Sequence, residues 1–433
     1  MNDKHARFLL HQLLSRTQDG QLTVEEDGVV RSFGQPTGAE PLRAHITVND
    51  PKFNQSILKG SLGLGQSYMD GLWDVDDMVT LIRIAARNVH RFDELRRTFR
   101  PVLAPLQSAV SLARRNTIER SREQISAHYD LGNDLYELFL DPSMMYSAAV
   151  FDTPDTPLYD AQIAKLDRIC QKLALKPGDR LLEIGSGWGA LAVHAAGKYG
   201  ARVTTTTIST EQHALAVERV KAAGLEDQVT VLLQDYRTLT GTYDKLVSIE
   251  MIEAVGWRDF PTFFRVCGER LADDGVMLLQ AITIDDRAYD VEKAVKSFIN
   301  QLIFPGGCLP SVEIISRNTA RQSDMRIVQL EDITEHYVTT LKHWRGTFEA
   351  ATEQLEERGY DERFRRLWRL YLSYCEAGFA ERRIQDVQLL IAKPKYRDEP
   401  VWALDSPSGD EGERARGPHA LPEPADDADA VAA

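Results

Sequence analysis

The middle of the chain alternates between short apolar runs and segments in which apolar residues recur with helical spacing. Strands are predicted over 181–184, 201–208, 228–233, 245–249 and 276–284, and helices over 190–198, 210–223 and 258–271. The last of these helices is expected to be stopped by Asp273, Asp274 and Gly275. Regular alternation of this kind requires a parallel, doubly wound sheet. The pattern predicts an α/β fold with its ligand site at the carboxyl ends of the strands.

The first 75 residues follow a different pattern, which predicts a small separate unit. Apolar and polar residues alternate over 21–29 and 42–48, as they do in half-buried strands. Helical spacing over 54–59 and 62–69 ends near Gly71. Mixed strands and helices without a cofactor or metal motif predict a small α+β domain that precedes the larger one.

Length and composition place limits on the rest of the chain. With 433 residues the chain is too long for one average domain, and its 43% apolar content is enough for a substantial core. The net charge of -14 is unevenly distributed, since residues 398–433 are acidic and rich in Ala, Pro and Gly. We expect that tail to be disordered.

A basic stretch lies between Leu81 and Arg122. It contains ten arginines against three acidic residues, with apolar residues interleaved. Such a stretch can bind anionic lipid headgroups, at about 1 kcal/mol per basic residue. Alternatively it is a solvated helical face that packs between domains, and the composition leaves both interpretations open. The acidity of the whole chain and the lack of a nucleic-acid motif argue against a nucleic-acid partner.

The cysteines and the N-terminus bear on the compartment. The four cysteines are widely spaced and none forms a Cys-x-x-Cys pair, so we expect neither a metal site nor a disulfide framework, and a reducing cytosol. Basic residues punctuate 1–18, which leaves no apolar core for a signal peptide. No eighteen apolar residues run together, so any contact with a membrane is expected to be peripheral.

Residues 181–189, with the sequence LLEIGSGWG, carry the strongest chemical signal. Glycines let the backbone turn sharply and approach a ligand closely, and an acid just before them can hold a charged or hydroxylated end of that ligand. The spacing Glu-x-Gly-x-Gly-x-Gly differs from the dinucleotide pattern Gly-x-Gly-x-x-Gly. It resembles motif I of the S-adenosylmethionine-dependent methyltransferases, in which the acid faces the methionine ammonium. The alternative is an ordinary tight turn between a strand and a helix.

Further segments extend the resemblance over about 49–394. They are 128–134 (HYDLGND), 139–147, 234–236 (QDY), 252–256 (IEAVG) and 303–310 (IFPGGCLP). Together with motif I they resemble the cyclopropane-fatty-acid synthases. This resemblance implies a seven-stranded, mostly parallel class I methyltransferase sheet beside the small N-terminal domain. It divides the chain into a lipid-interacting domain at 1–80, a basic linker at 81–122, a catalytic domain at 123–396 and an acidic tail at 397–433.

The resemblance also implies an activity. Family members transfer a methylene or methyl group from S-adenosylmethionine to the double bond of an unsaturated fatty acyl chain, here expected in a membrane phospholipid, to form a cyclopropane. An acyl methyltransferase that forms methylene- or methyl-branched chains, or precursors of furan fatty acids, is the alternative. A lipid-binding relative without catalysis and a small-molecule methyltransferase are further alternatives. We expect a cytoplasmic enzyme at the inner face of the membrane, with a homodimer among the expected assemblies.

Residue by residue, the resemblance assigns two groups of side chains. In the synthases a bicarbonate ion is understood to accept the proton, and its ligands match Glu253, Ile282 and Tyr337. Ala148 stands where the family has cysteine, and Gln280 where it has histidine. Glutamine still donates a hydrogen bond but alanine offers no side-chain partner, so these departures bear on bicarbonate affinity and on ring closure. The expected cofactor-binding residues are Tyr146, Ser147, Glu183, Gly185, Gly187, Gly189, Gln212, Asp235 and Tyr236.

Each assignment has a simpler structural alternative. Glu253 can cap the helix that follows it, and Tyr337 can be a half-buried core tyrosine. His128 and Tyr129 can be packing residues, whereas the resemblance implies a position near the cofactor. The apolar segment 304–307 can line an acyl channel or be only a loop.

Overall fold

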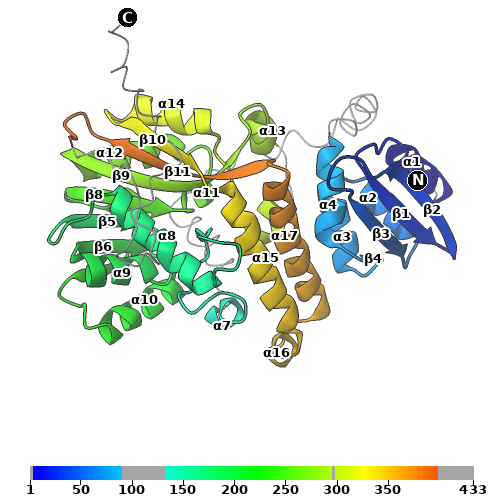
Figure 1. Cartoon of the computed structure of the whole chain (residues 1–433), viewed down its shortest axis with the longest axis horizontal. Helices are drawn as coiled ribbons and strands as arrows, with labels where there is room; N and C mark the ends of the chain where they lie inside the picture. The colour runs from blue at the N-terminus through cyan, green and yellow to red at the C-terminus, as the bar shows by residue number, and fades with distance from the viewer. Residues whose placement is uncertain (1–2, 90–131, 295–297, 398–433) are drawn as a thin grey trace, which may run out of the picture.

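The computed structural model describes residues 3–89, 132–294 and 298–397. These residues form three parts in a row, which are a small N-terminal unit, a pair of long helices and a large sheet covered by helices (Figure 1). The helix pair, α15 (Thr334–Ala350) and α17 (Glu362–Ala380), stands between the other two parts. None of the described helices is both long enough and apolar enough to cross a bilayer.

The N-terminal unit is a four-stranded sheet with helices packed on it. Its strand order is β2-β1-β3-β4, with β1 and β3 parallel and the other pairs antiparallel. Burial alternates residue by residue along β1, as expected for a sheet with one face on the core. The elements are α1 (Asp3–Leu14), β1 (Gly20–Glu26), β2 (Val29–Gln35), β3 (Arg43–Val48), α2 (Lys52–Ile57), α3 (Ser61–Met69), β4 (Trp73–Val75) and α4 (Met78–Arg87).

The large sheet has the order β10-β11-β9-β8-β5-β6-β7. Strands β9, β8, β5, β6 and β7 are parallel, while β11 runs antiparallel to both β9 and β10. The strands are β5 (Arg180–Ile184), β6 (Arg202–Thr207), β7 (Val229–Leu233), β8 (Tyr243–Ile249), β9 (Leu271–Ile284), β10 (Arg326–Asp332) and β11 (Ile384–Ala392).

Helices cover both faces of this sheet (Figure 1). One face packs on α8, α9 and α10, and the other on α11, α12 and α14. The central strands are nearly continuous apolar runs because both of their faces are buried. The helical elements are α7 (Asn133–Tyr136), α8 (Leu158–Lys172), α9 (Ala190–Tyr199), α10 (Thr210–Ala222), η2 (Tyr236–Thr238), α11 (Ile252–Val255), α12 (Phe260–Arg270), α13 (Tyr289–Ala294), η3 (Ile299–Ile303), α14 (Val312–Gln322), α15, α16 (Thr352–Glu357) and α17.

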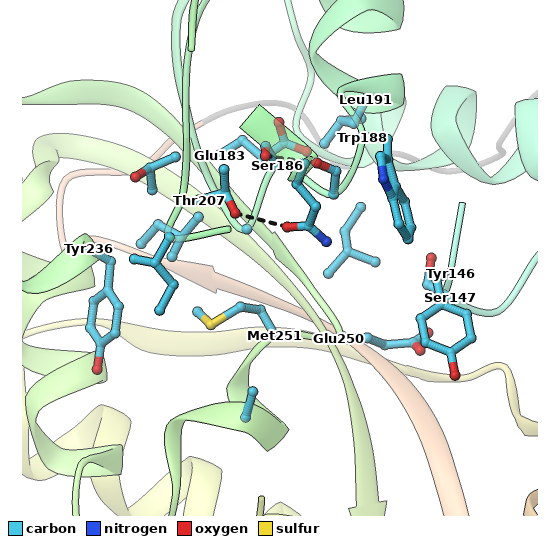
Figure 2. A pocket seen from close by; sticks show the side chains of 18 of the residues that line it. Tyr146, Ser147, Glu183, Ser186, Trp188, Leu191, Thr207, Tyr236, Glu250 and Met251 are labelled. Atoms are coloured by element: carbon cyan, nitrogen blue, oxygen red, sulfur yellow. Dashed lines mark hydrogen bonds between the residues drawn. The ribbon is translucent and has the colours of Figure 1, made fainter. Parts of the chain in front are cut away.

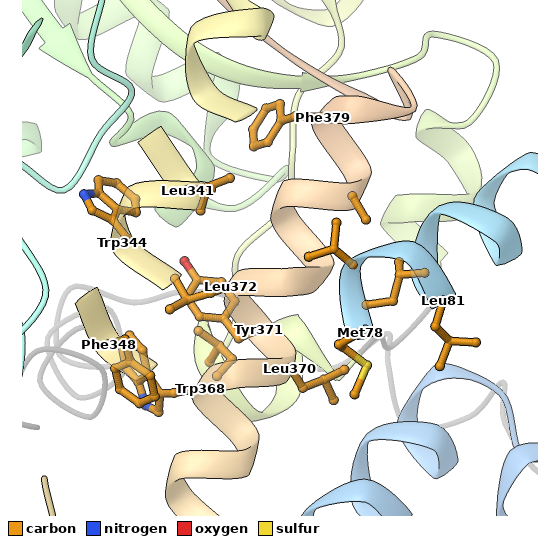
Figure 3. Packing of buried hydrophobic residues seen from close by; sticks show 14 of the residues in the cluster. Met78, Leu81, Leu341, Trp344, Phe348, Trp368, Leu370, Tyr371, Leu372 and Phe379 are labelled. Carbon is orange, nitrogen blue, oxygen red and sulfur yellow. The ribbon is translucent and has the colours of Figure 1, made fainter. Parts of the chain in front are cut away.

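Helix α17 joins the two ends of the molecule. One side of it packs on α4, where Leu370 lies beside Met78, and the other side faces Trp344 and Phe348 (Figure 3). One buried apolar cluster therefore runs from the N-terminal sheet through α17 to α15. Arg366 adds polar contacts, because its guanidinium donates to the carbonyl oxygens of Tyr68 at 2.5 Å and Trp73 at 2.7 Å.

The sequence-based expectations for the fold class are confirmed, with one local error. The seven-stranded, mostly parallel sheet and the small N-terminal α+β sheet are both present. Helix α12 ends at Arg270, one residue before its predicted end, but β9 begins at Leu271 and not at Val276, so the expected stop residues Asp273, Asp274 and Gly275 lie inside this strand, where its pairing with β8 is irregular. The expected division at residue 80 falls inside α4, and most of the basic stretch and of the acidic tail lies outside the described residues.

Candidate active site

A cavity opens at the carboxyl edge of the sheet, beside the ends of β5, β6, β7 and β8 (Figure 2). The space in it that no protein atom fills is about 1170 Å³, including the part open to solvent. Eight of the nine expected cofactor-binding residues line it, namely Tyr146, Ser147, Glu183, Gly185, Gly187, Gln212, Asp235 and Tyr236. The ninth, Gly189, begins α9 directly behind the loop.

Glu183 is a buried carboxylate on the wall of this cavity. Its Oε2 atom is buried and has no hydrogen-bond partner among the described residues. Burial raises the pKa of Glu183 to about 8, and the charge of Lys165 partly offsets that effect. A buried carboxylate oxygen without a partner is costly unless a donor or a cation arrives. The residue therefore fits the ammonium of a methionine group, as the motif predicts.

The glycines of the loop make room for the cofactor and for the helix behind it. Gly185 has φ +98°, and a Cβ there would lie 3.0 Å from Cγ of Met251. Gly189 has φ +90°, and a Cβ there would lie 3.1 Å from Cα of Ala216 on α10. A side chain at either position would meet both a clash and an unfavourable backbone conformation. The loop therefore needs glycine for packing as well as for approach to a ligand.

The far side of the cavity carries three further expected residues. Gln212 accepts a hydrogen bond on Oε1 from the Thr207 hydroxyl at 2.8 Å, which fixes the position of its amide (Figure 2). The Asp235 carboxylate accepts hydrogen bonds from Nε and Nη2 of Arg237 at 2.9 and 2.7 Å. Tyr236 lines the cavity and packs edge to face on Phe263 at 5.7 Å, and burial raises the pKa of its hydroxyl.

Glu250 is the residue around which the expected catalytic residues gather. Its Oε1 accepts the backbone N–H of Ala148 at 2.8 Å and the side-chain N–H of Gln280 at 2.7 Å. Its Oε2 accepts the hydroxyl of Tyr337 at 2.6 Å. Glu250 lines the cavity next to Ser147, and its side chain extends toward Tyr146 and Ser147 (Figure 2). Three predicted catalytic positions thus share one carboxylate that the sequence analysis had not assigned.

The other two expected catalytic residues contact each other. The Glu253 carboxylate accepts the backbone N–H of Ile282 on Oε1 at 2.5 Å, and burial raises its pKa to about 8. Its Oε2 is buried without a hydrogen-bond partner among the described residues. Glu253 is absent from the residues that line the cavity. The five predicted catalytic residues therefore gather around Glu250 and Glu253, and of this group only Glu250 lies on the cavity wall.

A buried polar chain fixes the orientation of Gln280. Its Nε2 donates to Glu250 and also to Asp386 at 3.0 Å, and its Oε1 accepts from Nε2 of Gln388 at 3.0 Å. Gln388 in turn accepts from Nζ of Lys172 at 2.7 Å. Because every polar atom of the Gln280 amide has a partner, its N–H groups face the two carboxylates and its oxygen faces away.

Two more polar residues near this group were missed from the sequence. Lys165 is fully buried on α8 and donates to the Ser147 hydroxyl at 2.7 Å, and burial lowers its pKa to about 8. Asp386 lies on β11, and its pKa is raised well above the ordinary value by burial and then by the charges of Glu250 and Glu253. The sequence analysis assigned no element to the segment that carries Lys165, and no signal along the sequence places Asp386 beside Glu250.

Aromatic rings close the cavity on the side of the helix pair. The hydroxyls of Tyr146 and Tyr371 are 2.7 Å apart, and the Tyr146 ring lies 5.2 Å from that of Trp344. Trp188 lies on the same wall as Tyr146, and its Nε1 donates to Asn133 at 2.7 Å. Phe304 of the apolar loop contacts Tyr371 edge to face at 5.9 Å. His128 and Tyr129 lie outside the described residues.

Several known proteins are similar to this chain in sequence and in fold. Residues 116–389 match the mycolic acid cyclopropane synthetase family. The chain is 41% identical over 360 residues to the cyclopropane-fatty-acyl-phospholipid synthase of Escherichia coli K12, with 81% of this chain and 88% of that protein covered. It is 37% identical over 369 residues to the tuberculostearic acid methyltransferase UfaA1 of Mycobacterium tuberculosis, with 81% and 84% covered. The crystal structure of the mycolic acid cyclopropane synthase CmaA1, complexed with S-adenosylhomocysteine and CTAB, matches with a TM-score of 0.59 at 32% identity, covering 63% of this chain and 98% of that chain.

Proposed function

The chain belongs to the mycolic acid cyclopropane synthetase family and is an S-adenosylmethionine-dependent methyltransferase of fatty acids or lipids, and we propose that its acceptor is the double bond of an unsaturated acyl chain in a membrane phospholipid. One observation carries the proposal. The same cavity offers at one end a buried carboxylate, Glu183, whose Oε2 has no partner among the described residues, and at the other end aromatic rings beside Glu250. A cationic donor and an apolar acceptor therefore fit side by side.

In this proposal the chain's own residues bind the cofactor, orient the acyl chain and shelter the reacting carbon atoms from water. S-adenosylmethionine, when bound, supplies a methyl group that is electrophilic because it is attached to a sulfonium. Glu183 holds the methionine ammonium, and the glycine loop lets the backbone approach the ligand. Tyr146 and Trp188 exclude water from the acyl carbocation that follows methyl addition, and their ring faces attract its positive charge. A basic group next to them then removes one proton.

The fate of that proton decides the product. Loss from the added methyl group closes a cyclopropane ring, and loss from a neighbouring chain carbon leaves a methylene branch. We favour the cyclopropane, because the expected catalytic residues gather beside the aromatic wall. The second candidate is a methyl- or methylene-branched chain, which the similarity to a tuberculostearic acid methyltransferase supports.

Mass spectrometry of lipids tests the proposal. The full chain is expressed in a host that makes unsaturated phospholipids, and the acyl chains are analysed after feeding methyl-labelled methionine. We expect acyl chains heavier by one labelled carbon group, with their double bond replaced by a ring. A branched product would favour the second candidate, and unchanged lipids with an active purified enzyme on small-molecule acceptors would contradict the proposal. Glu183→Gln, which is expected to bind S-adenosylmethionine more weakly, serves as the control with reduced labelling.

We also propose that the enzyme acts at the inner, cytoplasmic face of the membrane as a peripheral protein. Of the ten arginines in the basic stretch, Arg83 and Arg87 are bound to Glu40 and Glu381 within the fold. The other eight lie in 90–122, outside the described residues. Their excess positive charge is the feature that would attract anionic headgroups. A homodimer stays a prediction that sedimentation would test.

Vesicle binding tests the membrane proposal. Reversing Arg96, Arg97 and Arg100 to glutamate should weaken cosedimentation with anionic vesicles, and binding of the unchanged protein should fall as salt increases, because salt screens the attraction between charges. Vesicles without anionic lipid are the matched control. Binding that responds neither to the substitutions nor to salt would contradict the proposal.

A further inference from the structure

We propose that the carboxylate of Glu250 is the base that removes the proton after methyl transfer, in the place that the sequence resemblance gives to a bicarbonate ion. This inference rests on the proposed function and adds to it a residue that belongs to the chain itself. The reason is that the hydrogen-bond donors to Glu250 are groups that the resemblance assigns to bicarbonate. Three of the five groups expected to hold bicarbonate donate to Glu250, and a fourth, the N–H of Ile282, donates to the fifth, Glu253.

The expected bicarbonate ligands that are hydrogen-bond donors bind two carboxylates, those of Glu250 and Glu253. The N–H of Ala148, the amide of Gln280 and the hydroxyl of Tyr337 all donate to Glu250, at 2.6 to 2.8 Å. The N–H of Ile282 donates to Glu253. A bicarbonate ion presents planar oxygens to such donors, and the Glu250 carboxylate presents the same kind of oxygens. These four donors already have carboxylate acceptors within the described chain, so they bind no separate anion in this arrangement.

The departures from the family pattern agree with this arrangement. Cysteine is replaced by Ala148, which contributes only its backbone N–H, and Ala148 is fully buried. Histidine is replaced by Gln280, whose two N–H groups reach Glu250 and Asp386. A histidine ring has no pair of N–H groups on one nitrogen, and so it would not bridge the two carboxylates in this way. Both departures therefore suit an internal carboxylate.

The backbone of Glu250 indicates that its position is imposed by its surroundings. Its φ is +47°, in the left-handed region that residues other than glycine seldom adopt. The conformation is held by its own N–H, which donates to the Gln280 carbonyl at 2.8 Å. Strain of this kind persists only where the surrounding structure determines it, and such residues cluster at functional sites. The turn aims the carboxylate at the three donors while it remains on the cavity wall.

A carboxyl group must be ionised before it can accept a proton. The groups around Glu250 and Asp386 decide which of these two carboxyls carries the negative charge. Burial raises the pKa of Glu250 above its ordinary value, and its three hydrogen-bond donors and the Lys165 ammonium oppose that rise without cancelling it. Asp386 has no comparable set of donors, and its pKa is raised well above the ordinary value by burial and by Glu250. Two buried carboxyl groups so close together are not both ionised, and the three donors to Glu250 favour the charge on Glu250 and the proton on Asp386.

The step balances without a further reagent. The π pair of the acyl double bond forms a bond to the methyl carbon, the bond from that carbon to sulfur breaks, and its electron pair stays on the sulfur. An oxygen of Glu250 then takes a proton from the new methyl group, and the freed C–H pair closes the ring onto the cationic carbon. Taken from a neighbouring chain carbon, the proton leaves that pair as a double bond. Glu250 ends as a carboxylic acid and returns its proton to water when the product leaves.

Turnover with and without bicarbonate tests the inference. The full chain, Glu250→Gln and Glu250→Gly are assayed on vesicles of unsaturated phospholipid, in buffer freed of carbon dioxide and in the same buffer with added bicarbonate. We expect the unchanged protein to turn over at rates within about twofold in the two buffers. Glu250→Gln should lose at least about 100-fold in kcat in both, as is typical when a general base is removed. Its amide keeps an oxygen for two donors and an NH₂ for the Tyr337 oxygen, so the fold is expected to persist.

Rescue by small anions separates a base from a structural residue. Glycine suits φ +47°, and its missing side chain leaves space among the same donors, so bicarbonate or formate should raise kcat of Glu250→Gly at least tenfold. Calorimetry should give a Kd for S-adenosylmethionine within about threefold of the unchanged protein for both variants. Glu376→Gln is the matched control, because Glu376 is a buried glutamate bound to Arg345 outside the cavity.

The outcomes distinguish the inference from the proposed function. Rates of the unchanged protein that fall tenfold without bicarbonate would overturn the inference alone, and this measurement needs no variant. More than a tenth of kcat left in Glu250→Gln, or no response of Glu250→Gly to either anion, would also overturn it. A chain that methylates no phospholipid in either buffer would overturn the proposed function and, with it, the inference.

Discussion

At the scale of single residues, the protonation state of Glu183 is expected to change when S-adenosylmethionine binds. Its carboxylate is buried, its Oε2 has no hydrogen-bond partner among the described residues, and its pKa is about 8 because burial disfavours the charged form. Below pH 8 it is therefore mostly protonated before a ligand arrives. A cationic ammonium favours the ionised form, so binding must release a proton from this group.

Release of a proton on binding predicts how the affinity depends on pH. From pH 6 to 7.5 the affinity for S-adenosylmethionine should increase with pH, by up to about tenfold per unit. Calorimetry in two buffers with different heats of ionisation should detect release of close to one proton at pH 6.5. Glu183→Gln should bind about 10- to 100-fold more weakly and release no proton. An affinity that is flat with pH in the unchanged protein would contradict the assigned role.

Ala148 and Gln280 provide a second prediction at this scale. Ala148→Cys with Gln280→His restores the family pattern, but we expect no bicarbonate dependence while Glu250 remains, because its carboxylate already takes the donors. The same pair combined with Glu250→Gly should turn over only with bicarbonate. Rates and product ratios of the double and triple variants measure this. Bicarbonate dependence in the double variant would show that Glu250 yields its place to the ion.

At the scale of elements, α17 depends on one buried arginine. Arg366 is almost fully buried, binds two carbonyl oxygens of the N-terminal unit and lies over the Tyr68 ring at 4.0 Å. Arg363, one turn earlier, pairs with Asp70 at 3.0 Å while both side chains are about half exposed. The two residues contact the same unit from the same helix in very different surroundings.

The third prediction compares these two arginines. Arg366→Ala should lower the free energy of unfolding by about 2–4 kcal/mol, because it leaves buried carbonyl oxygens without donors and removes packing. Arg363→Ala should cost under about 0.5 kcal/mol, as exposed ion pairs usually do. Chemical denaturation of both variants measures the difference. Equal losses would mean that burial does not set the strength of these contacts.

The helices and strands also show how much of the fold can be predicted from the sequence alone. Helix α10 and strand β6 were predicted within one residue at each end, because amphipathic spacing and a short apolar run mark them clearly. Beyond Ile284 no periodicity was assigned, so β10, β11, α15 and α17 were missed as individual elements. The sequence placed 250–253 at the carboxyl end of a strand in the candidate site, but it gave Glu250 no role of its own. Its donors come from positions 148, 280 and 337, and only the closed sheet brings these together.

At the scale of the whole molecule, one apolar cluster spans the N-terminal unit, α17 and α15. Parts that share a core lose their packing together, so they are expected to unfold in one step. The fourth prediction is a single calorimetric transition for the full chain, in which the van't Hoff and calorimetric enthalpies agree. Two separated transitions would show that the N-terminal unit is independent in spite of the shared core.

The position of α17 has a consequence for protein engineering. Arg366 and Leu370 face the N-terminal unit, whereas Tyr371 reaches the hydroxyl of Tyr146 in the cavity. A chimera that exchanges only residues 3–89 with a relative would set a foreign surface against a helix fitted to the original one. The graft that keeps both interfaces intact transplants 362–380 together with the N-terminal unit, so the functional module is discontinuous in sequence.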